Sequence, residues 1–318
     1  MRIALIGAGC FGQNHKLAIS KRSDCKLAAV CDLNLGRALA LVEGTDAKIY
    51  ADYHEMLAQE QLDGVILNLP HFLHKSVTID CLEQGVAVLV EKPMALSVAE
   101  CDAMIEASQR TQMPLTVGHL SSYIPATRRI KELVKKETLG KLCSIVEIRN
   151  KDYFTNRPEW FLDKKLSGGG ITMNLGAHFI DKVLYVTDAL PERIVATGNN
   201  FLTDHTVEAA SHVQLTLTNG VIASGTYCGS KGAEHQETTF FFTNGIAQIR
   251  GGMELWMSEG NAPLVKIDIE DADTIFEHAL ETELQEFLKL IRGEENCATK
   301  VEHARNVICV LEQALSQI

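Results

Sequence analysis

The glycines after the first apolar run have the spacing of an anion-binding turn. Residues 2–6 read Arg-Ile-Ala-Leu-Ile, and Gly7-Ala8-Gly9-Cys10-Phe11-Gly12 follows directly. In a strand followed by G-x-G-x-x-G, the first glycine allows a tight turn, the second lets the backbone approach phosphates, and the third lets the next helix pack closely. The N–H groups at the start of that helix favour an anion. The pattern predicts a dinucleotide pyrophosphate pocket formed by Gly7, Gly9, Cys10, Phe11 and Gly12.

An acidic residue ends the second apolar run. Asp32 follows residues 27–31 and lies about twenty residues after Gly12, where a carboxylate accepts hydrogen bonds from ribose hydroxyls and repels a 2′-phosphate. This predicts NAD as the cofactor. NADP remains the alternative, because Arg37 is near enough in sequence to meet a 2′-phosphate. A second reading is that Asp32 only caps the helix starting near Asn34.

A lysine follows another apolar run. Residues 86–90 read Val-Ala-Val-Leu-Val and lead into Glu91-Lys92-Pro93. A lysine leaving a buried strand at a cleft can donate a hydrogen bond or a proton to a substrate oxygen, because desolvation and nearby positive charge lower its pKa. The alternative is a solvated loop lysine. Asn68-Leu69-Pro70-His71 follows a further apolar run and is expected at the same edge of the sheet.

The first third of the chain alternates strand and helix patterns. Near-continuous apolar runs predict strands at 2–6, 27–31, 63–69, 86–90 and 114–118, and helices are expected near 12–22, 34–43, 72–84 and 97–110. Ser97 and Glu100 form a capping-box pattern at the start of the last helix. This alternation predicts an α/β fold, a Rossmann-type doubly wound parallel sheet in a domain spanning residues 1–118.

The pattern changes after residue 118. A basic amphipathic helix is expected after Pro125, a strand at 141–149, and a helix near 175–187 after an irregular stretch. Residues 213–217 and 265–269 alternate polar and apolar types, and Asn219-Gly220 and Asn244-Gly245 predict hairpin turns. Helical spacing returns over 276–291 and 304–315. We expect residues 119–318 to form an α+β domain with a mainly antiparallel sheet.

Composition narrows the class of protein. The 318 residues carry 41 acidic and 30 basic side chains, a formal charge of −11, which argues against nucleic-acid and anionic-membrane partners. The nine cysteines form no C-x-x-C pair and suit a reducing compartment. Neither a signal peptide nor an apolar stretch of about 20 residues is present, so a cytoplasmic protein is expected.

Taken together, these motifs resemble the glucose-fructose oxidoreductase / inositol dehydrogenase / MocA (Gfo/Idh/MocA) family. The resemblance extends over nearly the whole chain, and the order and spacing of the motifs make it specific. The matching features are the glycine motif with Asp32, Pro70-His71-Phe72-Leu73-His74, Gly85 to Pro93, Val117-Gly118-His119, the Trp160 region, Gly168-Gly169-Gly170, and Asn174-Leu175-Gly176-Ala177-His178.

The resemblance implies an NAD(P)-dependent oxidoreductase acting on a CH–OH group of a sugar, a cyclitol or a related polyol or ketone. Lys92 matches the family's E-K-P lysine and His178 its proton-transferring histidine. A base within about 3 Å must take the proton of the alcohol, and an imidazole titrates in the right range. Besides the glycine loop and Asp32, we expect the cofactor to meet Asn68, Pro70, His74, Glu91 and Lys92. The substrate is expected to meet Lys92, His119, Tyr153, Trp160, Asn174 and His178.

The sequence departs from the family pattern at two places. Asn174 stands where relatives commonly carry Asp, four residues before the histidine, and Ser122-Tyr123 replaces a frequent Arg-Phe pair. Asparagine can still hydrogen-bond Lys92 or a substrate hydroxyl without supplying charge, so we expect it to take part in catalysis. The alternative is that it caps a helix. Both changes bear on which sugar is the substrate.

Other readings remain open. His71 and His74 are three residues apart, but no partner completes a ligand set, so no metal site is predicted. Some relatives use NAD for lyase or glycosidase chemistry, and one branch consists of cofactor-sensing regulatory proteins. The alternation in the second sheet, with the resemblance, predicts a dimer or tetramer formed partly through that sheet.

Overall fold

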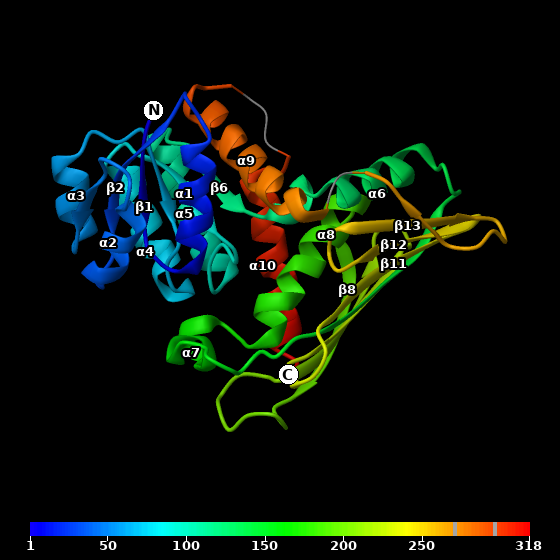
Figure 1. Cartoon of the computed structure of the whole chain (residues 1–318). Coiled ribbons are helices and arrows are strands. Elements are labelled where there is room, and N and C mark those ends of the chain that lie inside the picture. The colour runs from blue at the N-terminus through cyan, green and yellow to red at the C-terminus, as the bar shows by residue number, and fades with distance from the viewer. Residues whose placement is uncertain (270–271, 295–297) are drawn as a thin grey trace. The chain divides into compact units, whose positions relative to one another are not determined.

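The computed structural model describes residues 1–269, 272–294 and 298–318 and separates into two compact units (Figure 1). The first unit contains Met1–Leu120 and Glu277–Glu302, and the second contains Ser121–Phe276 and His303–Ile318. We expected residues 119–318 to form one domain, whereas in the structure the segment Glu277–Glu302 belongs to the first unit.

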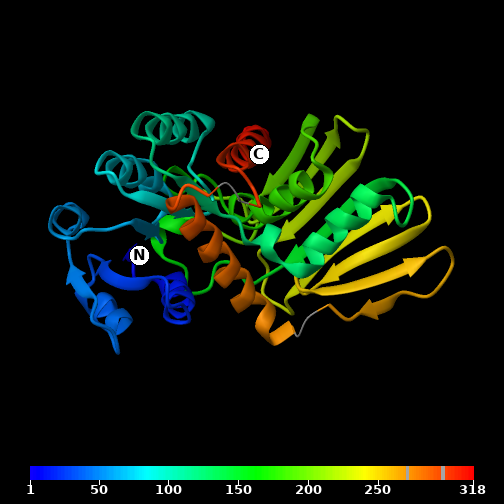
Figure 2. The ribbon, with the colours of Figure 1, turned by 90° about the horizontal axis from the view of Figure 1, so that it is seen from above.

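The first unit is built on a six-stranded parallel sheet with the order β3-β2-β1-β4-β5-β6. Its strands are β1 (Arg2–Ile6), β2 (Lys26–Cys31), β3 (Lys48–Tyr50), β4 (Gly64–Leu67), β5 (Ala87–Glu91) and β6 (Leu115–Gly118). The apolar runs are buried because helices cover both faces: α4 and α5 lie on one side and α1 and α2 on the other (Figure 2). The predicted doubly wound fold is confirmed.

The helices of this unit begin where the sequence supplies suitable caps. Asn34 Oδ1 accepts the Arg37 N–H at 3.1 Å, and Ser97 Oγ accepts the Glu100 N–H at 3.2 Å. The helical segments before the second unit are α1 (Cys10–Ser20), α2 (Leu35–Val42), α3 (Tyr53–Gln59), η1 (His71–Leu73), α4 (His74–Glu83) and α5 (Val98–Thr111).

Helix α9 (Ala272–Ile291) returns to this unit from residue 277 onward. It packs against β4, since a Cβ built on Gly64 would lie 2.9 Å from both Phe287 Cζ and Ile291 Cδ1. Lys21 Nζ also pairs with Glu277 at 2.6 Å and with Glu281 at 2.7 Å. The helix therefore belongs to the packing of the parallel sheet although it lies far along the chain.

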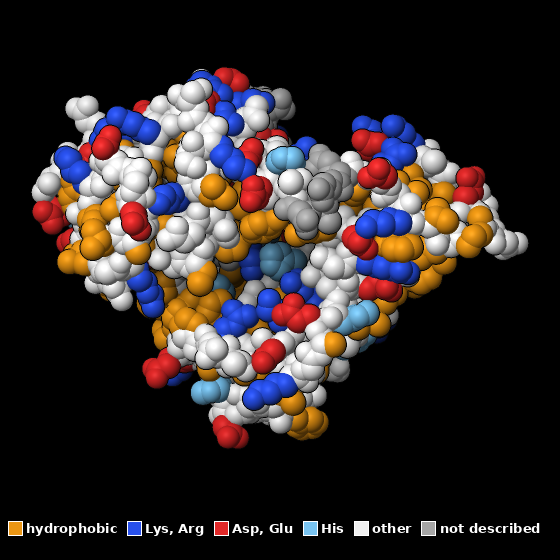
Figure 3. Space-filling model, viewed as in Figure 1, with side chains coloured by type: hydrophobic (Ala, Val, Ile, Leu, Met, Phe, Trp, Pro, Cys, Tyr) orange, Lys and Arg blue, Asp and Glu red, His pale blue; other side chains and the backbone are white. Residues whose placement is uncertain are grey.

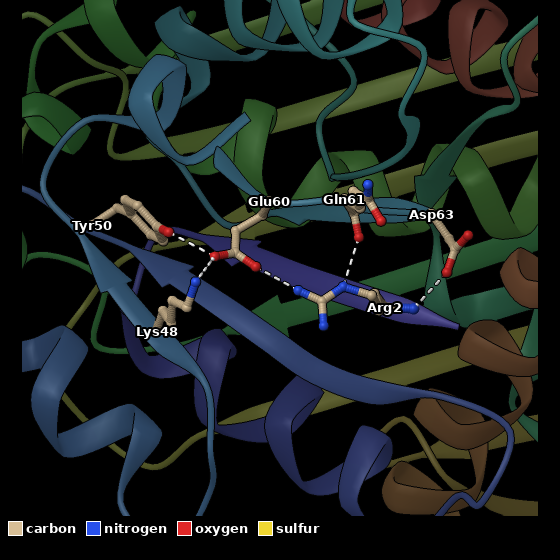
Figure 4. A network of polar contacts seen from close by, with 6 residues as sticks. All are labelled: Arg2, Lys48, Tyr50, Glu60, Gln61 and Asp63. Atoms are coloured by element: carbon tan, nitrogen blue, oxygen red, sulfur yellow. Dashed lines mark hydrogen bonds and ion pairs between the residues drawn. The ribbon is translucent and has the colours of Figure 1, made fainter. Parts of the chain in front are cut away.

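A polar network closes the amino ends of the strands (Figure 4). Glu60 accepts hydrogen bonds from Lys48 Nζ and Tyr50 Oη, both at 2.7 Å, and also pairs with Arg2. These donors lower the pKa of Glu60 despite its burial. Arg2 and Lys48 also line a surface pocket of about 440 Å³, at the opposite end of the strands from Asp32, Asn68 and Lys92.

The second unit contains an eight-stranded sheet with the order β14-β13-β12-β11-β7-β10-β9-β8. All its neighbouring strands are antiparallel except β7 and β10, which pair in parallel. The strands are β7 (Leu142–Asn150), β8 (Pro191–Asn199), β9 (Ala210–Leu217), β10 (Ile222–Cys228), β11 (His235–Phe242), β12 (Gly245–Arg250), β13 (Glu254–Glu259) and β14 (Val265–Ile267). The predicted, mainly antiparallel sheet is confirmed.

Helices α6 and α8 lie along one face of this sheet (Figures 1 and 2). Lys182 Nζ of α8 lies 2.8 Å from Glu147 Oε2 of β7 and donates to Thr238 Oγ1 of β11 at 2.7 Å, which identifies the covered face. The helical segments are η2 (Leu120–Tyr123), α6 (Pro125–Lys136), η3 (Glu159–Leu162), α7 (Lys164–Ser167), the π-helix η4 (Thr172–Gly176), α8 (Ala177–Thr187) and α10 (Val301–Leu315).

The described helices include none that combines the length and apolarity needed to cross a bilayer. Lys and Arg side chains are interspersed with Asp and Glu over the face drawn in Figure 3.

Candidate functional site

The glycine loop has the conformation that its sequence predicts. Gly7 has a φ of +100°, and a Cβ there would lie 2.3 Å from the Asn68 carbonyl oxygen, so only glycine fits. A Cβ on Gly9 would meet nothing within 4 Å, which leaves open space beside the loop. Helix α1 begins at exposed Cys10 with no side-chain cap and no acidic residue in its first turn. Its first N–H groups therefore suit a phosphate.

Asp32 holds this loop at the end of β2 through hydrogen bonds. Its Oδ2 accepts the Ala8 N–H at 2.7 Å, and its Oδ1 accepts the Asn34 N–H at 2.7 Å. The residue that caps α2 is Asn34 rather than Asp32, so the reading of Asp32 as a mere helix cap is wrong. The carboxylate lies beside the glycine loop, the position at which an acidic residue binds ribose hydroxyls in dinucleotide-binding folds.

Asn68 lies across from Gly7 at the end of β4. Its Oδ1 and Nδ2 are both buried and have no hydrogen-bond partner among the residues the structure describes. Buried amide groups are normally satisfied, so an orphaned one needs an external partner. Together with the open space at Gly9 and the uncapped helix start, this side chain fits a bound dinucleotide. Pro70 follows in the same loop and is half-buried.

His74 lies in the interior of the first unit. The ring is fully buried, with Nδ1 at 2.9 Å from the Pro93 carbonyl and Nε2 at 2.9 Å from the Leu69 carbonyl. Burial lowers the pKa of the ring. It thus ties the loop after β4 to the loop after β5, and its polar atoms are directed at protein carbonyls. His71 packs against it, but the described chain contains no group of three residues suited to a metal.

Lys92 is half-buried at the end of β5, next to a contact between His15 and Glu91. His15 Nε2 lies 2.9 Å from Glu91 Oε1, and the Lys92 N–H donates to Glu91 Oε2 at 3.3 Å. Glycine at 118 leaves room for this carboxylate, because a Cβ there would lie 3.3 Å from Glu91 Oε2. Glu91 therefore stabilises the backbone at Lys92 through this hydrogen bond. His15 was not anticipated, since its partner is 76 residues away.

In the second unit, η4 runs directly into α8. Across residues 171–184, all of which the structure describes, Asn174 and His178 are the two that are not buried. They lie four residues apart, on one side of the helical segment. Asn174 sits in the middle of the π-helix and not at its start, so the reading of Asn174 as a helix cap is wrong. Single-turn π-helices are frequent at functional sites.

Tyr153 supports this segment from the irregular stretch. It is fully buried, donates to the Gly170 carbonyl at 3.3 Å and hydrogen-bonds Asn174. Burial raises its pKa to about 12, so it stays a neutral donor. The Arg157 guanidinium carbon lies 4.8 Å from the centre of the Tyr153 ring. Trp160 packs against Phe161 with the two rings tilted, and it is half-buried.

The predicted site residues therefore fall into two groups, one in each unit. The glycine loop, Asp32, Asn68, Pro70, His74, Glu91 and Lys92 belong to the first unit, as does His119, which is buried after β6. Tyr153, Trp160, Asn174 and His178 belong to the second.

Residues 1–119 match a domain described as "Oxidoreductase family, NAD-binding Rossmann fold", and residues 127–248 match the GFO/IDH/MocA C-terminal domain. The chain belongs to the Gfo/Idh/MocA family. The resemblance read from the motifs is confirmed, and with it the NAD-binding type of the first domain.

The names of individual relatives indicate different activities. The chain is 25% identical over 305 residues to the rhizopine catabolism protein MocA of Rhizobium meliloti, covering 92% of this chain and 87% of that protein. It is 28% identical to myo-inositol 2-dehydrogenase of Thermotoga maritima, covering 67% and 62%. It is 29% identical to 2,7-anhydro-N-acetylneuraminate hydratase of Mediterraneibacter gnavus, covering 62% and 52%. With several relatives, the match thus spans only a little over half of the relative's length.

Among solved structures, GenD2 from gentamicin A biosynthesis in complex with NAD is similar along the whole chain. The TM-score is 0.87 at 20% identity, covering 100% of this chain and 93% of GenD2. At this identity the likeness shows the shared fold.

Proposed function

We propose that this protein is an NAD-dependent oxidoreductase that interconverts a secondary alcohol and a ketone on a sugar or cyclitol. The observation that carries the proposal is the pair Asn174 and His178, the two residues that remain accessible in a segment otherwise buried from 171 to 184. A half-buried polar pair in an otherwise buried segment, in a family of NAD-binding oxidoreductases, suits substrate binding and proton transfer.

In this proposal each residue has one task. Bound NAD supplies the hydride acceptor for the carbinol carbon. Lys92 donates a hydrogen bond to the substrate oxygen and stabilises the negative charge that develops there. His178 takes the hydroxyl proton as hydride leaves, and Asn174 orients the substrate through its amide. In the reverse direction His178 returns the proton to the ketone oxygen.

Replacement of the lysine tests the proposal. Lys92→Met should lower kcat by at least a factor of about 100, since one oxyanion donor contributes roughly that much, while NAD binding measured by tryptophan fluorescence persists. Lys21→Met, a lysine paired with Glu277 and Glu281, is the matched control and should keep the wild-type kcat. Reduction of NAD at 340 nm is followed with cyclitols, aldoses, sugar phosphates and glucosides. Full turnover by Lys92→Met would refute the role of Lys92.

A second candidate is elimination or hydration through a transient ketone, supported by the relative named as a hydratase. Oxidation beside a C–H bond makes that proton easier to remove, and returning the hydride afterwards regenerates NAD. Product would then form without net NADH. Parallel measurement of NADH and of product by mass spectrometry separates the two candidates.

We also propose that the protein is a homo-oligomer assembled partly through the eight-stranded sheet. Its face opposite Glu147 and Lys182 carries Ile148, Ile222 and Phe241, which are 52%, 46% and 38% exposed. Apolar side chains of this size on one flat surface favour contact with a second copy.

A further inference from the structure

Glu208 is a buried acid that no motif singled out. It lies between β8 and β9, and only 5% of its surface is exposed. Its carboxylate accepts hydrogen bonds from backbone N–H groups. Burying a carboxylate is costly unless hydrogen bonds compensate. The position of those N–H donors therefore indicates which part of the fold the carboxylate stabilises.

The donors are at the entrance to the helical segment that carries Asn174 and His178. The Gly170 N–H lies 2.9 Å from each oxygen of Glu208, and the Thr172 N–H donates to Oε1 at 2.8 Å. The Ile171 N–H in addition donates to the Glu208 backbone carbonyl at 3.3 Å. Glu208 thus satisfies three consecutive amides that a helix start would otherwise leave without acceptors.

The peptide group of Gly170 is held from both sides. Its carbonyl accepts the Tyr153 hydroxyl at 3.3 Å and the Asn174 N–H at 3.1 Å. A side chain is excluded there, because a Cβ on Gly170 would lie 2.2 Å from the Glu208 carbonyl oxygen. Thr172 is fixed in turn by Ser211, whose Oγ accepts its hydroxyl at 2.7 Å.

We infer that Glu208 is a positioning residue for the proton-transfer pair. It acts through the backbone of Gly170–Thr172 and sets the start of the π-helix, which places Asn174 and, one turn later, His178. Hydrogen bonds to an ionised acceptor are about twice as strong as neutral ones, and a negative charge suits a helix N-terminus. The inference rests on the proposed role of Asn174 and His178.

A carboxylate that only stabilises the fold would behave differently from one that positions the site. Glu147 offers a matched comparison, because it is a buried acid of the same unit, held by Lys182 and Thr238 on the sheet. Both glutamates can therefore be replaced by glutamine in parallel, and loss of thermal stability can be compared with loss of turnover.

The variants are Glu208→Ala, Glu208→Gln and Glu147→Gln in the full chain, assayed with NAD and the substrate that gives the highest wild-type rate. Glu208→Ala should lower kcat at least tenfold, since small misplacements of catalytic groups have large effects on rate, with the KM for NAD within twofold. Glu208→Gln keeps one acceptor oxygen and should recover part of the loss. Glu147→Gln should lower the Tm without lowering kcat. Wild-type kcat in Glu208→Ala, or an equal loss in Glu147→Gln, would overturn the inference.

Amide hydrogen exchange tests the positioning role of Glu208 without requiring enzyme turnover. In Glu208→Ala, exchange at Gly170 and Thr172 and through residues 173–178 should rise at least tenfold, while that of the first unit stays unchanged. If no substrate is turned over by the wild type, the proposed function fails, and this exchange pattern still decides whether Glu208 positions the segment. Unchanged exchange at residues 170–178 would refute it.

Discussion

Both carboxylate oxygens of Asp32 accept backbone hydrogen bonds, from Ala8 of the glycine loop and from Asn34. The side chain is nevertheless half-buried, not enclosed. An oxygen that already accepts one hydrogen bond keeps capacity for a second. Asp32 therefore holds the loop and keeps acceptor capacity for a ribose hydroxyl, and we expect its charge to oppose a 2′-phosphate in the same place.

Neutralising this charge should change the cofactor preference. In Asp32→Asn, the ratio of kcat/KM for NADP to that for NAD is expected to rise at least tenfold, about 1.4 kcal/mol, because repulsion of the 2′-phosphate is removed. Asp52→Asn is the control, since Asp52 caps α3 through the His54 N–H at 2.8 Å and belongs to the same unit. An unchanged ratio in Asp32→Asn, measured with both cofactors at fixed ionic strength, would contradict this role.

At the scale of elements, most strands of the parallel sheet and the longer helices were predictable because their apolar runs are long, whereas β8 and β13 of the second sheet were not predicted. Neither β3 nor α3 was predicted: β3 is only three residues long, and α3 is seven residues long with Met56 as its one buried residue, too little for a periodic pattern. The partners of site residues were not predicted either, such as His15 for Glu91 and Glu208 for Gly170. Those contacts join residues 76 and 38 positions apart, and spacing carries no signal for them.

Helix α9 contains an acid whose burial gives a testable pH dependence. Both oxygens of Glu283 are buried without a hydrogen-bond partner in the described parts of the chain. Burial, followed by the charges of Glu91 and Glu286, raises its pKa well above the usual range. The folded state therefore keeps this proton to higher pH than the unfolded state does. The free energy of unfolding consequently decreases as the pH rises above about 4.3, the pKa of glutamate in an unfolded chain.

Glu283→Gln should remove this dependence, because glutamine has the same shape and no charge to desolvate. We expect its Tm at pH 8 to exceed that of the wild type by at least about 2 °C, the shift produced by roughly 1 kcal/mol in a chain of this size, with a smaller difference at pH 5. Thermal unfolding by circular dichroism across this range measures it. Glu281→Gln, which weakens a pair with Lys21, should lower the Tm slightly. A Glu283→Gln variant less stable than the wild type at pH 8 would contradict the argument.

At the scale of the whole molecule, the eight-stranded sheet is large enough for assembly. Eight strands spaced about 4.8 Å apart give a surface about 38 Å wide. All of them except the three-residue β14 have six or more residues and extend the surface by about 20 Å, which brings its area close to the 800 Å² per partner of a standard interface. Phe241 and Ile222 lie in one row across Ser144, and Ile148 lies on the same face.

Charges on that face should dissociate the oligomer. Sedimentation of the wild type at micromolar concentration is expected to show a dimer or tetramer, and Phe241→Lys combined with Ile148→Asp should give monomers with unchanged far-UV circular dichroism. Thr216→Lys, in the same row but without an apolar side chain to lose, should disturb assembly less. A wild type that sediments only as a monomer would refute the proposal.

The return of α9 to the first unit has a consequence for synthesis on the ribosome. Once Leu120 has been made, the parallel sheet still lacks the helix that covers Gly64, and about 180 further residues must be translated before Glu302 completes that unit. At about 5–20 residues per second this takes roughly 10–40 s. A gene cut after Leu120 would therefore yield a first fragment without Glu277–Glu302 and a second fragment that carries this segment of the other unit.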